Sequence, residues 1–168
     1  KLLGMVLLQS EVLELKANPN RKAVGNVVES GLEAGGPTAT LLVRKGTLKV
    51  GDVMVCGNHF GKVRALVDHE GKRIKQAGPS SAVKVLGLNG VPDAGAEFNI
   101  LPNEKEARSV CESRDTKQRN EASASKRKTT LATLFSRMET DSDKALNLII
   151  KADTQGSVEA IVDSINKI

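Results

Sequence analysis

The stretch from Gly46 to Leu66, GTLKVGDVMVCGNHFGKVRAL, restricts the fold more than any other part of this chain. From Lys62 to Val67 it alternates basic and apolar residues, with the period of two that half-buried strands show. Upstream, the apolar run Val53–Val55 lies between Gly51–Asp52 and Gly57, and such residues favour tight turns. The stretch therefore predicts short strands joined by tight turns.

Similar apolar runs recur along most of the chain, and glycine-rich turns separate them. They cover residues 24–30, 38–44, 52–56, 61–67, 82–88 and 96–101. Short strands with regular turns are typical of a closed barrel or a sandwich. About 80 residues make too small a sandwich to cover its own edges, so a small closed β-barrel is the prediction.

Helical patterns flank the predicted barrel. Residues 1–16 predict an amphipathic helix, ambiguous after Ser10, and Asn18–Asn20 with its central proline ends it. Because the chain starts on this helix without a methionine, we expect it to be a piece of a longer protein.

Residues 104–128, after the predicted barrel, predict a solvated helix that fades into a basic linker. Its packing stripe is Ala107, Val110 and Cys111.

The C-terminal part predicts half of an α/β unit. Thr129 and Thr130 are expected to cap a helix at 131–138, followed by a strand at 146–150. A last helix has an apolar face of Val158, Ile161, Val162, Ile165 and Ile168. Residues 153–157, between that strand and helix, suit either a helix cap or an anion site at the helix N-terminus, and we favour the cap.

Composition narrows the class of function. The 168 residues carry a net charge of +5 with a pI near 9.3, which favours a polyanionic partner. Aromatic residues make up 2%, so any RNA contact is expected to use charge and shape rather than base stacking. Two cysteines favour a reducing compartment. The longest apolar run, 2–8, is too short to span a bilayer, so no membrane partner is expected.

Patterns of catalysis or metal binding are weak. Cys56 and His59 stand three apart, with Asp68 and His69 further on, but a structural zinc site needs a second such pair. The glycine-rich run at 87–95 lacks a following helix and is interpreted as a turn. The sequence contains no Gly-x-x-x-x-Gly-Lys-Ser/Thr phosphate loop. We therefore predict no catalytic residue, no cofactor site and no metal site in this chain.

Several strings, in order along the chain, resemble bacterial-type translation initiation factor two. They are EVLELKANP at 11–19, GTLKVGD at 46–52, GKVRAL at 61–66, AGPS at 77–80 with VLGL at 85–88, VP at 91–92 before AG at 94–95, and LNLIIK at 146–151 before QGSVEA at 155–160. The resemblance implies four parts. Residues 1–18 are the tail of a GTP-binding domain, 19–101 a barrel like that after the nucleotide-binding domain of translational GTPases, 102–128 a connecting helix and linker, and 129–168 the start of an α/β/α third domain.

The same resemblance implies docking rather than turnover. The barrel is expected to rest on the small ribosomal subunit and its rRNA, while the preceding GTPase domain, with GTP and Mg²⁺, and the initiator-tRNA-binding domain lie outside this chain. The expected rRNA contacts are the barrel's basic residues Arg44, Lys45, Lys49, Lys62, Arg64, Lys72, Arg73 and Lys75. Lys62 and Arg64 share one strand face, and Lys72, Arg73 and Lys75 crowd one turn, so these five come first. Lys49 also suits a solvated turn.

Two further expectations follow from the resemblance. The loop at 32–37 carries no basic residue where the family often has one, which argues against a phosphate contact there. The expected location is the bacterial cytoplasm or, as the alternative, an organellar matrix or stroma. The competing function is a protein-interaction or spacer barrel that packs against its own GTPase domain without touching RNA.

Overall fold

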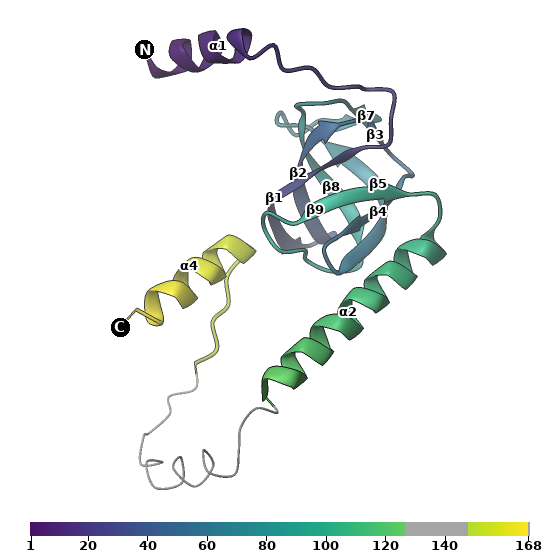
Figure 1. Cartoon of the computed structure of the whole chain (residues 1–168), viewed down its shortest axis with the longest axis vertical. Coiled ribbons are helices and arrows are strands. Elements are labelled where there is room, and N and C mark those ends of the chain that lie inside the picture. Colours follow the sequence, from purple (N-terminus) through teal and green to yellow (C-terminus); the bar gives the residue numbers. More distant parts are fainter. Residues whose placement is uncertain (127–147, 168) are drawn as a thin grey trace, which may run out of the picture.

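The computed structural model describes residues 1–126 and 148–167 of the chain. A small β-barrel forms its centre, and three helices project from it (Figure 1). Helix α1 (Leu2–Val12) precedes the barrel, α2 (Glu104–Lys126) follows it, and α4 (Gln155–Ile165) lies near the C-terminus. None of the helices in the described ranges is long and apolar enough to cross a membrane.

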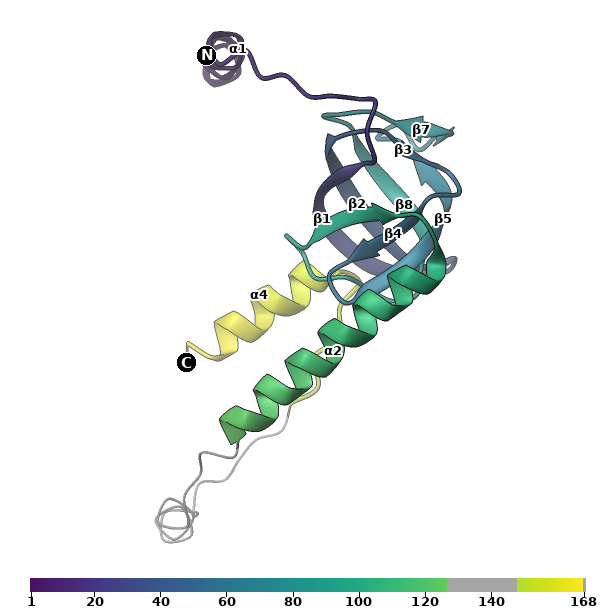
Figure 2. The ribbon, with the colours of Figure 1, turned by 45° about the vertical axis from the view of Figure 1, so that its right-hand side comes forward.

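Six strands close the barrel. They are β1 (Val24–Glu33), β2 (Gly36–Lys45), β4 (Val53–Cys56), β5 (His59–Val67), β8 (Ala82–Leu88) and β9 (Glu97–Leu101). Their order is β4-β9-β1-β2-β8-β5, all neighbours are antiparallel, and β5 pairs with β4 to close the ring. Each corresponds to one of the apolar runs, so the prediction of a small closed barrel is confirmed (Figure 2).

Three two-residue strands escape the sequence pattern. Strand β6 (Arg73–Ile74) extends the sheet beside β5, while β3 (Leu48–Lys49) pairs with β7 (Gln76–Ala77) in a separate ribbon. Two residues are too short to show an alternation, so their pairing becomes visible only in the fold.

The barrel interior holds the main core. Its largest fully buried side chains include Leu41, Met54, Leu66 and Phe98, which come from four different strands. Burying a side chain of this size stabilises a fold by about 1.5–3 kcal/mol. Because alternate residues point inward, the residues between them point outward to solvent or to α2.

Strands β5 and β8 approach so closely that both need glycine at the contact. A Cβ at Gly61 would lie 2.2 Å from the carbonyl oxygen of Gly87, and Gly87 has a φ of +118°. The register between the strands shifts from Gly61 to Ala65. This irregularity puts both Val63 and Leu66, three residues apart, into the core.

Helix α2 packs on the outside of the barrel. Ala107 and Cys111 are buried against Val55 of β4, with Phe60 and Leu101 beside them. The predicted helix and its packing stripe are therefore confirmed. At the first turn Asn103 Oδ1 accepts the Glu106 N–H at 2.8 Å, which caps the helix, and a side-chain bond from Asn103 Nδ2 to Glu106 Oε1 at 2.9 Å holds the amide in place.

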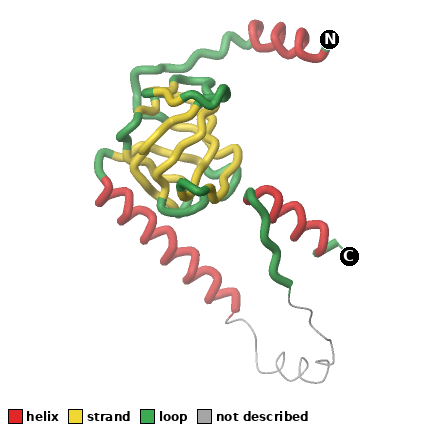
Figure 3. Tube along the Cα trace, turned by 180° about the vertical axis from the view of Figure 1, so that it is seen from behind, coloured by secondary structure: helices red, strands yellow, loops and turns green. Residues whose placement is uncertain are grey.

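Helix α1 forms as predicted but has no single apolar face. Its residues are all exposed, and it stands away from the barrel in all views (Figure 3). The side chains that are more than half exposed include Leu2, Leu3, Met5, Val6, Leu7 and Leu8. The prediction of an amphipathic helix is wrong, because six apolar residues within seven positions surround the helix axis instead of lining one side.

The C-terminal prediction is confirmed in part. Helix α4 begins at Gln155, but Leu148–Ile150, the described end of the strand predicted at 146–150, is not in a strand. A strand needs a neighbour for its backbone groups, and the described ranges offer none to these three residues. The helix predicted at 131–138 lies outside the described residues, as do Arg127 and Lys128 of the basic linker.

Candidate nucleic-acid interface

The outer face of β5 presents Lys62 and Arg64. Both side chains are exposed, whereas Gly61 before them and Val63 between them are buried. Within the described ranges neither cation lies in an ion pair. Two unpaired cations on alternate positions of a rigid strand provide a site that can attract phosphate groups.

The backbone around β5 is fixed from both edges. One edge pairs with β8, and the other pairs first with β4 and later with β6. Between these, the Gly51 N–H donates to the Val63 carbonyl at 2.8 Å and the Val63 N–H donates to the Asp52 carbonyl at 2.9 Å. The two basic side chains therefore project from a strand that is hydrogen-bonded almost throughout.

Lys49 and Lys75 lie together next to this strand. Lys49 pairs with Gln76, and the Val50 N–H donates to the Lys75 carbonyl at 3.0 Å. Asp52 Oδ2 accepts the backbone N–H of Lys49 at 2.8 Å, so this carboxylate shapes the turn. Both lysine side chains are exposed. They are two further exposed cations, beside the Gly51–Asp52 turn that bonds Val63 of β5.

The turn that carries Lys72 and Arg73 also carries acidic groups. Lys72 Nζ lies 2.5 Å from Glu70 Oε2. The backbone N–H of Lys72 donates to Asp68 Oδ1 and lowers the pKa of that carboxyl, helped by the N–H of Glu70. Asp68 therefore stays ionised beside the lysine. This turn is less positive than its lysine and arginine content suggests.

Arg44 and Lys45 form a second, separate group. They end β2, and β8 lies between β2 and β5 in the sheet. Arg44 Nη1 donates to Asn26 Oδ1 over 3.4 Å. Arg44 and Lys45 both line a hollow of about 660 Å³. Its other lining residues include Pro79 of the barrel and Lys16, which lies in the segment between α1 and the barrel. The eight predicted residues thus lie in more than one place.

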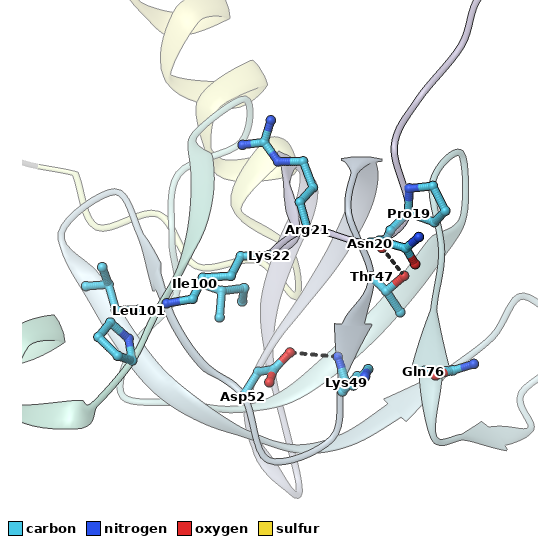
Figure 4. A pocket seen from close by; sticks show the side chains of 11 residues that line it. Pro19, Asn20, Arg21, Lys22, Thr47, Lys49, Asp52, Gln76, Ile100 and Leu101 are labelled. Carbon is cyan, nitrogen blue, oxygen red and sulfur yellow. Dashed lines mark hydrogen bonds between the residues drawn. The ribbon is translucent and has the colours of Figure 1, made fainter.

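A larger hollow, of about 700 Å³, contains basic residues that the sequence prediction missed. Arg21 and Lys22 line it together with Lys49 and Asp52 (Figure 4). Lys22 extends toward Ile100, while Asp52 points to the backbone of Lys49. The signal available in the sequence was the basic pair directly after the Asn18–Asn20 break.

Cys56 and His59 face different surroundings. Cys56 is buried at the end of β4, and the imidazole of His59 lies against Gly90, where a Cβ would come 2.5 Å from Nδ1. Among the described residues, no three histidine, cysteine or acidic side chains gather to hold a metal ion. The glycine-rich run at 87–95 folds onto β1, where its Pro92 carbonyl accepts the Ser30 hydroxyl.

Among the described residues, the two segments that could hold a phosphate of GTP are engaged in contacts within the chain. The phosphate-loop sequence is absent from all 168 residues, and the run at 87–95 uses Pro92 and Gly95 to bond β1. At the N-terminus of α4, Thr154 Oγ1 lies 3.0 Å from Ser157 Oγ, and these two hydroxyls bond each other.

Comparison with known proteins identifies the family of the chain. Residues 12–100 match the family model for elongation factor G domain 2, and residues 120–168 match that for translation-initiation factor 2. Translation initiation factor IF-2 of Halalkalibacterium halodurans is 53% identical over 100% of this chain and 23% of its own length. That of Bacillus licheniformis is 53% identical over 100% of the chain and 24% of its own length.

A solved structure shares the fold. GDP-bound aIF5B from Aeropyrum pernix matches 99% of this chain and 28% of its own, with a TM-score of 0.54 and 20% identity. The chain spans about a quarter of the length of the curated relatives it matches. Because those relatives are 53% identical to the chain over its whole length, the chain belongs to the translation initiation factor IF-2 family.

Proposed function

We propose that this chain is the docking part of a translation initiation factor, and that its barrel binds rRNA of the small ribosomal subunit. The observation that carries the proposal is the outer face of β5, where Lys62 and Arg64 are exposed without an ion-pair partner in the described ranges. A polyphosphate backbone is the partner that such a face attracts most strongly. Lys49 and Lys75 support it from the adjoining ribbon.

The remaining predicted contacts rank lower within this proposal. Lys72 and Arg73 are secondary because Glu70 and Asp68 offset the charge of their turn. Arg44 and Lys45 belong to a different part of the barrel, which requires either a curved RNA surface or a second contact. Arg21 and Lys22 join the candidates because they line the hollow that also contains Lys49.

We further propose the domain organisation that the resemblance implies. Residues 1–18 end a GTPase domain that holds GTP and Mg²⁺ in the longer protein, 19–101 form the barrel, 102–128 connect, and 129–168 begin the third domain. Initiator tRNA is bound through a domain beyond this chain. The chain itself is then a connector without catalytic residues, and its location is the bacterial cytoplasm, consistent with its bacterial relatives.

Charge reversal tests the docking surface. Lys62→Glu is expected to weaken binding of the 168-residue chain to purified small subunits at least tenfold, measured by co-sedimentation at low salt. Lys105→Glu is the matched control, since Lys105 is an exposed lysine in the first turn of α2 and undergoes the same change of charge. Equal affinity of both variants and the unchanged chain would remove rRNA docking through β5.

The exposed apolar helix α1 favours a second candidate function. Leu3, Leu8 and Val12 are each more than half exposed, and such a helix is suited to pack on a protein domain. In this alternative the barrel is a spacer against the GTPase domain and touches no RNA. Failure of the unchanged chain to bind small subunits at any salt concentration, while it binds the isolated GTPase domain, would favour the spacer.

A further inference from the structure

Strand β1 has an edge that the barrel covers only in part. On that side β9 pairs with Val24–Asn26, and the loop at Gly95–Ala96 then bonds Val27. Further along, the hydroxyl of Ser30 donates to the carbonyl of Pro92. From Gly31 onward, the described barrel strands offer no neighbour on this side. An open strand edge is a template to which another extended segment can pair.

A segment from the far end of the chain occupies this edge. Gly31 of β1 and Thr154 form an antiparallel β-bridge across 123 positions of sequence (154 − 31). Thr154 is the residue directly before α4, and it has the extended backbone of a strand, with φ −126° and ψ 152°. The helix therefore starts immediately at the contact.

The contact depends on the absence of a side chain at position 31. A Cβ on Gly31 would lie 2.8 Å from the carbonyl oxygen of Asp153, a distance that real Cβ atoms essentially never show. The obstacle is backbone, which cannot turn aside as a flexible side chain can. Gly31 has an ordinary negative φ, so its conformation does not itself require glycine. The requirement at this position comes from the close approach of residues 153–154.

Polar side chains surround the junction. A small hollow of about 110 Å³ is lined by both partners, with Glu29, Glu33, Thr38 and Lys84 on the barrel side and Asp153 and Thr154 on the other. Lys84 Nζ lies 2.7 Å from Glu33 Oε1. Lys84, the basic residue in this lining, therefore pairs with Glu33, one of the two glutamates on the barrel side.

We propose that the Gly31 edge of β1 is the docking site for residues 153–154 and the α4 helix that follows them. The barrel thereby positions the C-terminal part of the chain by backbone pairing. The junction is an interaction surface within the molecule. It is separate from the proposed rRNA docking, because the junction and the docking surface do not depend on each other. Its occupant is a defined segment of this same chain.

Nuclear Overhauser effects in the 168-residue chain test the junction. The unchanged protein is expected to give cross-peaks between backbone protons of Gly31 and Thr154, because paired antiparallel residues bring these protons together. Gly31→Ala is expected to abolish them. The cross-peaks between residue 31 and its β2 partner Thr38 should persist, which shows that the hairpin is still folded.

Gly78→Ala is the matched control. Position 78 has no heavy atom within 4 Å of an added Cβ and no positive φ, so this variant should keep the Gly31–Thr154 cross-peaks. Absence of those cross-peaks from the unchanged chain, or their survival in Gly31→Ala, would overturn the proposal. If Gly31→Ala also loses the contact with Thr38, the cross-peaks of the unchanged chain alone decide.

Discussion

At the residue scale, the surroundings of Cys56 change the chemistry of its side chain. It ends β4 inside the barrel, and burial, followed by the nearby Cys111, raises the pKa of its thiol to about 12. The thiolate is the reactive form of cysteine, so this residue is protected from alkylation in the folded state. Cys56 acts as a small apolar core residue, which agrees with its interpretation as part of a strand.

This thiol predicts a loss of stability in alkali. The folded pKa is above the ordinary value of 9.0, so the stabilising contribution is complete below about pH 9 and is lost as pH rises toward about 12. Urea unfolding at several pH values should show a smaller alkaline decrease in Cys56→Ala than in the unchanged chain. Lysine titration is common to both proteins and cancels in the comparison. Equal alkaline decreases would contradict the prediction.

Single residues also mark where sequence prediction reaches its limit. Lys62 and Arg64 were predicted to share one face from alternation alone, and the fold keeps them exposed. Asp68 and Glu70 lie within four positions of Lys72 in the sequence. Only the folded turn shows that Asp68 accepts the Lys72 backbone N–H and that Glu70 pairs with the Lys72 ammonium. Contacts such as Gly31 with Thr154 join distant positions, and local periodicity contains no information about them.

At the scale of elements, the strands were predictable and the short ribbons were not. Each barrel strand is at least four residues long and lies between turns, so its alternation was readable. The β3–β7 ribbon depends on pairing between Leu48–Lys49 and Gln76–Ala77, which lie far apart in the sequence. Helix α2 was predictable because its few apolar residues recur at helical spacing.

The Asn103 cap of α2 gives a prediction at this scale. Asn103→Ala removes the bond to the Glu106 N–H and is expected to cost about 1 kcal/mol of helix stability. Amides in the first turn of α2 should then exchange their hydrogens roughly fivefold faster, a ratio that follows from that free energy. Asn20→Ala is the control, because Asn20 is exposed and precedes the barrel. Unchanged exchange at Ala107 and Arg108 in the Asn103 variant would contradict the cap.

At the scale of the whole molecule, a rigid barrel supports helices that leave it in different directions. The barrel and α2 share buried contacts, whereas α1 has none of its residues buried. Leu148–Ile150 shows why the C-terminal part was harder to predict. A strand pattern in sequence becomes a strand only beside a partner, and the described chain supplies none there. The family to which the chain belongs was recognisable from short strings, some of which lie within these elements, such as 61–66 in β5 and 85–88 in β8.

The salt dependence of small-subunit binding tests the central claim most directly. If the β5 face binds rRNA phosphates, the logarithm of the association constant should fall linearly with the logarithm of salt concentration. Arg64→Ala should reduce the slope by about 1, the value for one lost phosphate contact, while Arg108→Ala on α2 should leave it unchanged. An affinity that does not fall with salt, or an Arg64 variant with the slope of the unchanged chain, would contradict docking through this face.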